Sequence, residues 1–286
     1  MLRDGSYVGE RDVATVDVDE IIHMMVGREV TQYYPKSEHH AGDVRMEVRG
    51  LSLPKLVRDI SFQVRSGEVL GIGGLVGSGR TELMRGIFGA DRIASGQILI
   101  DGKPVSLSSP KVSVQNRIAF LTEDRKRSGL LMGQTIWSNI VISGLSKLGK
   151  HGLLTEGRAI RVAEEYRKTL NIRMPSARAL VENLSGGNQQ KVIFARWLFS
   201  DSDIIMFDEP TRGIDVGAKT EIYELIDRLV LDGKAVVLIS SDMMELMGIS
   251  DRIAVMSNGQ LAGIIDRADF TQERIMELAL TGYMDK

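Results

Sequence analysis

Gly74-Leu75-Val76-Gly77-Ser78-Gly79-Arg80-Thr81 is the stretch of sequence that decides the fold. It follows a short apolar run at residues 69–73 and precedes a helix-like stretch at residues 82–88. This order of strand, glycine-rich turn and helix is typical of a phosphate-binding loop. Glycines let the backbone fold closely around an anion, so that its N–H groups and the positive end of the helix point at the phosphates. We therefore predict an α/β fold built on a P-loop NTPase core.

One position of this loop departs from the P-loop pattern. The pattern G-x-x-x-x-G-K-[ST] has Lys where this chain has Arg80, whereas Thr81 supplies the hydroxyl that would hold Mg²⁺. Arg keeps the positive charge, but its planar group is longer and cannot sit as a compact point charge between two phosphates. The loop therefore predicts nucleotide binding without efficient catalysis at this position. The alternative is an ordinary glycine-rich turn between a strand and a helix.

The composition excludes several classes of protein. The chain of 286 residues is long enough for one large domain or a domain with an appendage, and its 43% apolar and 26% charged residues are typical of a globular protein. A net charge of −2 gives no basic footprint for nucleic acid, and the lack of cysteine excludes disulfides and thiolate metal sites. The apolar runs are far shorter than the roughly 20 residues that cross a bilayer. Work at a membrane would therefore require docking onto another protein.

The two ends of the chain have similar patterns. Residues 1–9 predict a hairpin around Asp4-Gly5 and residues 17–27 a short helix that ends in glycine. Residues 256–263 turn around Asn258-Gly259, and residues 271–282 predict a terminal helix at nearly the same spacing. Internal similarity of this kind indicates duplication. We therefore expect residues 1–43 to be the tail of a preceding copy plus a linker, and residues 44–286 to be the nucleotide-binding domain. Coincidence is the alternative.

The predicted linker, residues 33–43, is polar and contains the adjacent His39 and His40. A metal site needs more ligands than one histidine pair. We expect these histidines to be solvated.

The remaining pattern predicts two additions to a mostly parallel core sheet. Alternating residues at 46–48 and 60–64, with turns at Ser95-Gly96 and Asp101-Gly102, predict an antiparallel β layer beside the core. From about residue 124 to residue 190 the pattern becomes helical. We therefore predict a helical insertion subdomain between core strands.

Two further motifs carry chemistry. Ser185-Gly186-Gly187-Asn188-Gln189 opens a helix, so it predicts a second anion-binding helix end, and a plain capped helix is the alternative. Asp208 and Glu209 end an apolar run and are too costly there without a cation or a catalytic task. Asp208 would hold Mg²⁺, and Glu209 would polarise an attacking water. A further apolar strand ends in polar residues at 240–242. We expect four motifs to meet at the C-terminal strand ends: the phosphate loop, the signature segment, Asp208-Glu209 and residues 240–242.

These residues together resemble a known family. The sequence LSGGNQQK at 184–191, DEPTRGIDVGAK at 208–219 and the loop ending in Arg80-Thr81 are similar to the motifs of ATP-binding cassette (ABC) ATPases. More narrowly, they resemble the second cassette of the tandem ATPase subunits of bacterial ribose, galactose and xylose importers. The resemblance covers the chain from about Arg45 to its end, and residues 1–30 resemble the closing segment of a first cassette.

The resemblance implies an ATPase that uses ATP and Mg²⁺ and couples hydrolysis to monosaccharide uptake. It implies a peripheral position at the cytoplasmic face of the bacterial inner membrane. The implied partners are the first cassette of the same polypeptide (or a second copy), membrane permease subunits and, indirectly, a periplasmic sugar-binding protein, with no nucleic acid.

The resemblance also implies roles for individual residues, because such cassettes bind each ATP between the phosphate loop of one and the signature segment of the other. The nucleotide-binding residues are those from Gly74 to Thr81, together with Ser185, Gly186, Gly187, Asn188, Gln189 and Asp215; Glu209, Ser241 and Glu123 are catalytic, and Thr81, Asp208 and Glu123 are metal ligands. The signature serine and glycines would clamp the γ-phosphate of ATP held by the first cassette.

The site on this chain's own loop departs from the family pattern. Arg80 replaces Lys, Glu123 stands where Gln is usual, and Ser241 stands where His is usual. An adenine-stacking aromatic residue is also absent between Arg49 and Asp59. We therefore expect an asymmetric pair, in which this half completes the first half's site and turns over ATP poorly at its own. The alternatives are a non-transport ABC ATPase acting on DNA or ribosomes, and a purely regulatory half.

Overall fold

The computed structural model describes residues 2–3, 6–10, 12, 34–149 and 155–284. Near the N-terminus, β1 (Leu2–Arg3) pairs antiparallel with β2 (Ser6–Tyr7), as the expected hairpin requires. The predicted helix at residues 17–27 lies outside the described residues. The duplication therefore stays a prediction.

A six-stranded, mostly parallel sheet carries the loop that follows residue 74. Its order is β12-β11-β5-β10-β9-β8, and neighbours run parallel except for β11 and β12. The strands are β5 (Glu68–Gly74), β8 (Ile118–Leu121), β9 (Ile204–Asp208), β10 (Ala235–Ile239), β11 (Arg252–Ser257) and β12 (Gln260–Asp266). Every residue of β8, β9 and β10 is buried. Apart from Asp208 at the end of β9, the residues of these strands are apolar, as parallel strands covered on both faces require.

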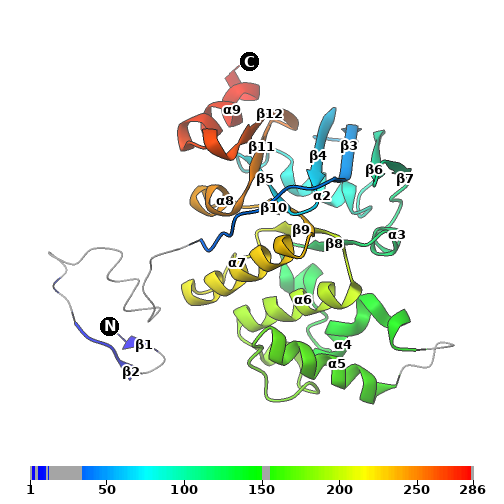
Figure 1. The fold of residues 1–286 in the computed structure, drawn as a ribbon, viewed down its shortest axis with the longest axis vertical. Helices are drawn as coiled ribbons and strands as arrows, with labels where there is room; N and C mark the ends of the chain where they lie inside the picture. Colours follow the sequence, from blue (N-terminus) through cyan, green and yellow to red (C-terminus); the bar gives the residue numbers. More distant parts are fainter. Residues whose placement is uncertain (1, 4–5, 11, 13–33, 150–154, 285–286) are drawn as a thin grey trace.

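The predicted antiparallel layer is a four-stranded sheet in the order β4-β3-β6-β7. It consists of β3 (Val44–Ser52), β4 (Ile60–Arg65), β6 (Ser95–Ile100) and β7 (Lys103–Val105). Alternate residues of β4, namely Ile60, Phe62 and Val64, are buried, because only one face of this strand packs on the core. Strand β4 of this sheet lies beside β5 and β12 (Figure 1).

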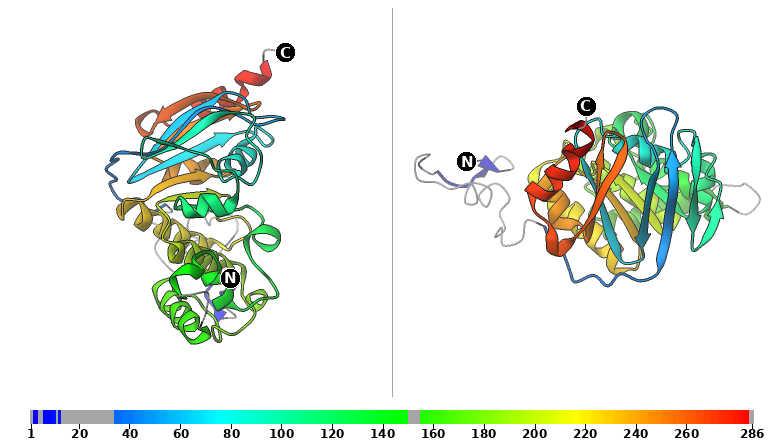
Figure 2. Two further views of the ribbon diagram at one scale, coloured as in Figure 1. Left: turned by 90° about the vertical axis from the view of Figure 1, so that its right-hand side faces the viewer. Right: turned by 90° about the horizontal axis from the view of Figure 1, so that it is seen from above.

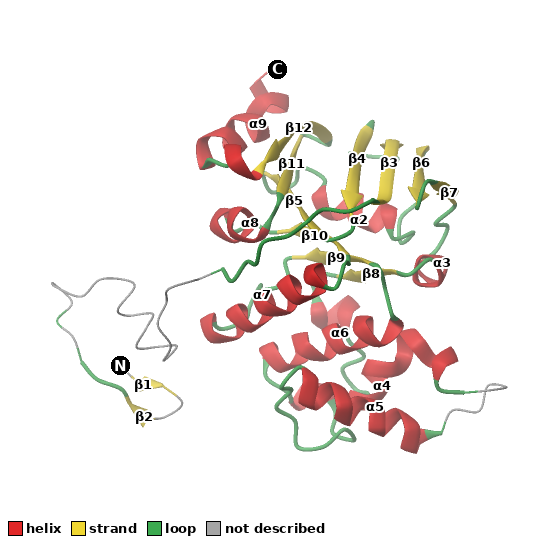
Figure 3. Ribbon diagram, viewed as in Figure 1, coloured by secondary structure: helices red, strands yellow, loops and turns green. Residues whose placement is uncertain are grey.

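Helices occupy two regions. Near the sheets lie α2 (Arg80–Ile87), α3 (Pro110–Gln115), α7 (Val216–Leu231), α8 (Met243–Ile249), the short η4 (Arg267–Asp269) and α9 (Gln272–Met284). The lobe opposite the antiparallel strands contains α4 (Ile136–Val141), η2 (Ile142–Lys147), α5 (Glu156–Thr169) and α6 (Gly186–Ser200), with η1 (Arg125–Gly129) and η3 (Val181–Asn183) in the chain between β8 and α6. The left-hand view of Figure 2 shows the same division, and Figure 3 shows the helices of both regions in red in the view of Figure 1. None of the helices in the described part of the chain is long and apolar enough to span a bilayer.

The helical segment expected at 124–190 covers the elements of this lobe from η1 to the first turn of α6. It opens at η1, which directly follows Asp124, and the helix α6 that begins near its expected end continues to Ser200. The boundaries of the domain and of the insertion therefore stay predictions.

Residues 34–42, which we term the strap, pack against α7 and the end of α8. The His39 side chain is 2% exposed, with Nε2 2.7 Å from Asp227 and Nδ1 3.1 Å from Asp251. The expectation of solvated histidines is therefore wrong for His39, whereas His40 is exposed. Within the described ranges, no group of three or more His, Cys, Asp or Glu side chains is arranged to hold a metal ion.

Candidate nucleotide-binding site

The predicted phosphate loop turns between β5 and α2 on glycines in the left-handed region. Gly74 has φ 138°, and a Cβ there would lie 2.4 Å from the carbonyl oxygen of Met256. Gly79 caps α2 with φ 99°. Ser78 is fully buried, and its hydroxyl has no hydrogen-bond partner among the described residues. The backbone is thus wrapped at the N-terminus of a helix, which is the arrangement that binds phosphate.

Arg80 is turned toward the sheet. It is 9% exposed, and its Nη1 donates to the carbonyl oxygen of Ser240 at 3.1 Å. Burial lowers the pKa of its guanidinium, while the nearby Glu209 and Asp208 act in the opposite direction. One N–H of the guanidinium is therefore committed to the end of β10.

Asp208 ends β9 and is 1% exposed, and both of its carboxylate oxygens lack a hydrogen-bond partner among the described residues. Burial raises its pKa to about 6, against the effect of the neighbouring Thr81 hydroxyl. Glu209 raises the pKa further, and Arg80 lowers it. A buried carboxylate with open oxygens beside a hydroxyl is a donor set that suits a hard cation such as Mg²⁺. Thr81 and Asp208 therefore fit the predicted metal.

Glu209 and Ser241 meet at the ends of neighbouring strands. Glu209 follows β9 with φ 51°, and its backbone N–H donates to the carbonyl oxygen of Ile239 at 3.0 Å. The Ser241 hydroxyl donates to Glu209 Oε2 at 3.0 Å. The structure thus brings together two of the three residues predicted to be catalytic.

The third, Glu123, is engaged elsewhere. It is exposed and forms an ion pair with Arg212 in the loop after β9. Arg125 donates to the carbonyl oxygens of Arg212 at 3.0 Å and of Gly213 at 3.3 Å. These contacts of Arg125 could not be predicted from the sequence, because they join residues 87 and 88 positions apart. The metal role of Glu123 stays a prediction.

The signature segment begins α6 on the helical lobe. Ser185 is its N-cap, and the Ser185 hydroxyl accepts from Asn188 Nδ2 at 2.9 Å. The Gln189 side chain donates to the carbonyl oxygens of Val181 at 3.3 Å and Leu184 at 3.1 Å.

This segment borders the loop after β9. The atoms closest to a Cβ at Gly186 belong to Arg125 and Gly213, and the one closest to a Cβ at Gly187 belongs to Ala218. Three of the four motifs therefore meet at the strand ends, as expected: the phosphate loop, Asp208-Glu209 and residues 240–242. The fourth, the signature segment, lies instead beside the loop that follows β9.

Asp215 has a local structural task. It is the N-cap of α7, and its carboxylate accepts from the backbone N–H of Ala218 at 3.0 Å. Its predicted contact with nucleotide stays a prediction.

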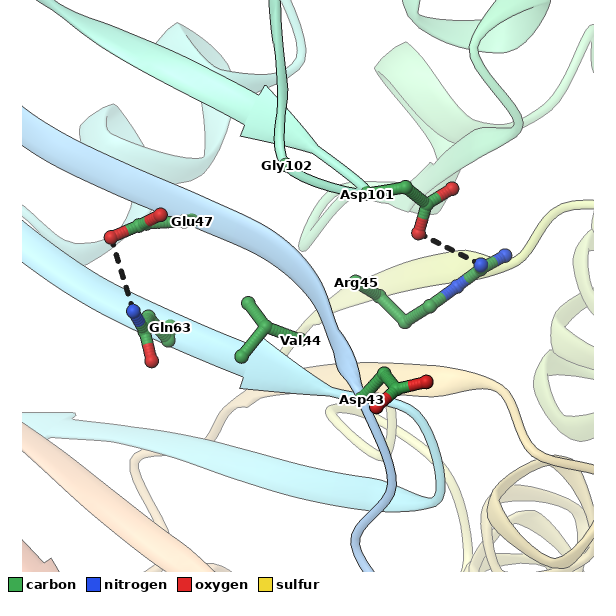
Figure 4. A pocket seen from close by; sticks show the side chains of 7 residues that line it. All are labelled: Asp43, Val44, Arg45, Glu47, Gln63, Asp101 and Gly102. Atoms are coloured by element: carbon green, nitrogen blue, oxygen red, sulfur yellow. Dashed lines mark hydrogen bonds and ion pairs between the residues drawn. The ribbon is translucent and has the colours of Figure 1, made fainter.

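A polar hollow with a volume of about 440 Å³ opens elsewhere, and Figure 4 shows its lining side chains. It is lined by Asp43, Val44, Arg45, Glu47, Gln63, Asp101 and Gly102. Arg45 pairs with Asp101 at 2.8 Å and with Asp203, just before β9, at 3.0 Å. The hollow therefore lies near the N-terminal ends of the parallel strands, away from Asp208 and the phosphate loop.

Solved structures share the fold of this chain. An ATP-binding cassette described as MJ1267 in its ADP conformation superposes with a TM-score of 0.68 at 18% identity, over 84% of this chain and 100% of that one. A dimeric post-hydrolysis cassette, MJ0796 bound to ADP and Pi, superposes with a TM-score of 0.66 at 23% identity, over 79% of this chain and 100% of that one.

Curated relatives are more similar in sequence. A putative ribose/galactose/methyl galactoside import ATP-binding protein 1 of Burkholderia lata is 48% identical over 281 residues, which is 98% of this chain and 55% of the relative. The ribose import ATP-binding protein RbsA of Clostridium tetani is 46% identical over 98% of this chain and 56% of the relative. The chain therefore spans about half the length of these relatives. The family model for ABC transporter matches residues 57–212, from before the phosphate loop to beyond Glu209, and the chain therefore belongs to the ABC transporter family as one of its ATP-binding domains.

Proposed function

We propose that this chain is one ATP-binding half of a bacterial ABC importer for a monosaccharide and that it couples ATP binding and hydrolysis to sugar uptake. The support comes from relatives named as ribose or ribose/galactose/methyl galactoside import ATP-binding proteins, which align with 98% of this chain. Another cassette, in the same polypeptide or a second copy, would supply the opposite face of each ATP site. Permease subunits and a periplasmic sugar-binding protein complete the partners, and the chain would work at the cytoplasmic face of the inner membrane.

In this proposal the chain holds Mg–ATP at the C-terminal end of its parallel sheet. The loop from Gly74 to Thr81 orients the phosphates with its backbone N–H groups, and Thr81 and Asp208 hold Mg²⁺. The bound ion would neutralise charge on the phosphates during transfer. Glu209 would accept a proton from the attacking water, with one of its oxygens held by the Ser241 hydroxyl at 3.0 Å.

We further infer that the two sites of the pair are unequal. The observation that carries this inference is Arg80, whose guanidinium is bonded to the carbonyl oxygen of Ser240. An arginine anchored in this way is a poor substitute for a lysine that approaches two phosphates as a point charge. The signature segment of this chain, Ser185 to Gly187, would clamp the γ-phosphate of the ATP held by the other half, whose site would turn over faster.

The test is sugar-stimulated ATP hydrolysis by the reconstituted importer with variants in this half only. Ser185→Ala is expected to lower the rate by about tenfold or more, because it removes a phosphate-facing hydroxyl from the fast site, whereas Glu209→Gln is expected to change it by less than about twofold. Thr155→Ala, at the exposed N-cap of α5, is the matched control and is expected to be silent. Equal losses in Ser185→Ala and Glu209→Gln would contradict the asymmetry.

The same experiment separates the alternatives. A purely regulatory half predicts that Ser185→Ala leaves the stimulated rate unchanged. A non-transport ATPase predicts no stimulation by permease and sugar-loaded binding protein. In isolation, we expect this chain to hydrolyse ATP slowly, and strong hydrolysis that Glu209→Gln abolishes would contradict the proposal.

A further inference from the structure

One buried acid takes no part in the site described above. Glu245, on α8, is 1% exposed, and burial raises the pKa of its carboxyl, although hydrogen bonds from Ser240 and Thr211 oppose this shift. Its two oxygens accept from Thr211 Oγ1 at 2.9 and 3.1 Å, and Oε2 also accepts from Ser240 Oγ at 2.6 Å. A buried carboxylate is costly unless such donors satisfy it. The contacts therefore fix the two hydroxyl-bearing segments relative to α8.

Both segments carry side chains of the nucleotide site. Thr211 lies two residues after Glu209, and Ser240 directly precedes Ser241. The carbonyl oxygen of Ser240 is also the acceptor for Arg80. The Glu245 carboxylate thus connects the loop after β9 to the loop after β10. The contact between Glu209 and Ser241 depends on this connection, because one residue lies on each loop.

Glu209 needs external support for its position. Its φ of 51° places a non-glycine residue in the left-handed region, which is sparsely populated and persists only where the surroundings hold it. Its carbonyl oxygen accepts from the backbone N–H of Arg212 at 3.2 Å, within its own loop. Two of its hydrogen bonds leave that loop: its backbone N–H donates to the carbonyl oxygen of Ile239, and its carboxylate accepts from the hydroxyl of Ser241. Both partners belong to the end of β10, so any displacement between the two loops would break them.

We propose that Glu245 is a positioning residue for ATP hydrolysis, with Thr211 and Ser240 as the two arms of a clamp that holds Glu209 in register with Ser241. This inference rests on the proposed function for its reaction and on the described contacts for its geometry. The clamp touches no nucleotide. It acts by preventing the two loops from moving apart.

A role limited to the stability of α8 makes a different prediction. The N-terminus of α8 is capped by Asp242, whose carboxylate accepts from the backbone N–H groups of Met244 at 3.0 Å and Glu245 at 3.2 Å. The helix therefore does not need the Glu245 side chain to begin where it does. Substituting that side chain should disturb the loops more than the helix.

The first test is amide hydrogen exchange on the full chain. Glu245→Met keeps the side-chain length and removes both acceptors, Thr211→Val removes one donor, and Thr211→Ser retains it. We expect the amides of Glu209 and Arg212 to exchange at least about fivefold faster in the first two variants and at the wild-type rate in Thr211→Ser, with α8 unchanged. Unchanged exchange at these two amides, or an equal increase along the whole chain, would overturn the clamp.

The second test is steady-state ATP hydrolysis at the site that contains Glu209, whose slow turnover has to be measured apart from that of the other half. For this purpose the same variants are placed in an importer whose other half carries the substitution equivalent to Glu209→Gln, so that the residual rate comes from this chain. Glu245→Met and Thr211→Val are expected to lower kcat by about tenfold with KM changed less than about twofold, and the double variant is expected to be no slower than the slower single variant. Glu273→Gln, the control on exposed α9, is expected to be silent.

The outcomes separate the two proposals. A raised KM at unchanged kcat, or Thr211→Ser as slow as Thr211→Val, would overturn the positioning role. If the unmodified importer shows no sugar-stimulated hydrolysis, the proposed function fails, and the exchange measurement still decides whether the clamp exists.

Discussion

The carboxylate of Asp208 is costly to keep charged. Burial raises its pKa from 3.8 to about 6, although the neighbouring Thr81 hydroxyl opposes this shift. A shift of that size corresponds to about 3 kcal/mol of stability that the nucleotide-free protein gives up when this side chain ionises. A bound cation would recover that free energy, so the same side chain that destabilises the free protein favours the metal-bound one.

This cost predicts an unusual pH dependence for Asp208→Asn. The folded pKa lies above the unfolded value, so the wild-type chain is unaffected by this group below about pH 4 and becomes less stable as the pH rises through about 6. The amide cannot ionise. In nucleotide-free urea unfolding, the stability of the variant relative to wild type should therefore rise by about 3 kcal/mol between about pH 4 and about pH 8.

Asp203→Asn is the matched control for this prediction. Burial opposes ionisation of Asp203, but hydrogen bonds from Lys234 and Arg117 outweigh it and lower its pKa. Its contribution is present above the unfolded pKa and is lost as the pH falls, so this variant should lose stability relative to wild type as the pH rises. The same direction of change in both variants would contradict the argument for Asp208.

At the residue scale, the sequence was informative where a side chain is costly in its local context. Two carboxylates at the end of an apolar run, Asp208 and Glu209, are such a case, and the structure places them at a strand end beside the phosphate loop. The direction taken by Arg80 could not be predicted, because its acceptor lies 160 positions away. Glu245 gave no signal either, since a glutamate in the first turn of a helix is ordinary on an exposed surface.

At the scale of elements, Arg196 joins the helical lobe to the segment after β8. It lies on α6 and is 8% exposed, and burial lowers the pKa of its guanidinium to about 10. Its Nε and Nη2 donate to the backbone oxygen of Asn139 at 2.7 Å and to its Oδ1 at 2.9 Å, and Nη1 donates to the carbonyl oxygen of Gly129. One side chain thus fixes α6, α4 and the end of η1 together.

Arg196→Met should therefore destabilise the fold by about 3 kcal/mol, because it leaves three buried acceptors without their charged donor. Urea unfolding followed by helical circular dichroism measures this change. Arg178→Met is the control, since that side chain is 69% exposed and its ion pair with Glu156 lies at the surface, so it should cost less than about 1 kcal/mol. Comparable losses of unfolding free energy in the two variants would show that the contacts of Arg196 with Asn139 and Gly129 do not stabilise the fold.

The elements that could be predicted are those with local signals. The turn residues Asp101-Gly102 and Asn258-Gly259 have positive φ values and join β6 to β7 and β11 to β12, as turn chemistry requires. The arrangement of the helical lobe could not be predicted in the same way. It depends on Arg196, whose partners lie 57 and 67 positions earlier and leave no periodic pattern.

At the scale of the whole molecule, the strap joins the N-terminal part of the chain to the domain. Lys36 Nζ lies 2.7 Å from Asp251, and His39 lies between Asp251 and Asp227. Asp251 also accepts from the backbone N–H of Val69 at the start of β5. The polar composition of the strap predicted a linker. Its packing could not be predicted, because Ile249, Asp251 and Asp227, which bind Lys36 and His39, lie 188 to 213 positions later.

Asp251→Asn should release the strap. Burial opposes ionisation of Asp251, but hydrogen bonds from His39 and Lys36 outweigh it and lower its pKa. The contribution of Asp251 to stability is therefore present at neutral pH and is lost as the pH falls through the folded pKa, below the usual carboxylate range. We expect Asp251→Asn to lower the free energy of unfolding by about 2 kcal/mol at about pH 7, where the partly buried ion pair is intact, and by less as the pH is lowered.

Limited proteolysis gives the local readout for the same variant. Cleavage within the strap should become faster in Asp251→Asn, because the backbone of residues 34–42 can then leave the surface of α7 and be bound by a protease. Asp266→Asn, an exposed substitution at the end of β12, should leave both cleavage and unfolding unchanged. If Asp251→Asn lowers stability equally at all pH values, or leaves strap cleavage unchanged, then the contacts of Lys36 and His39 do not hold this segment.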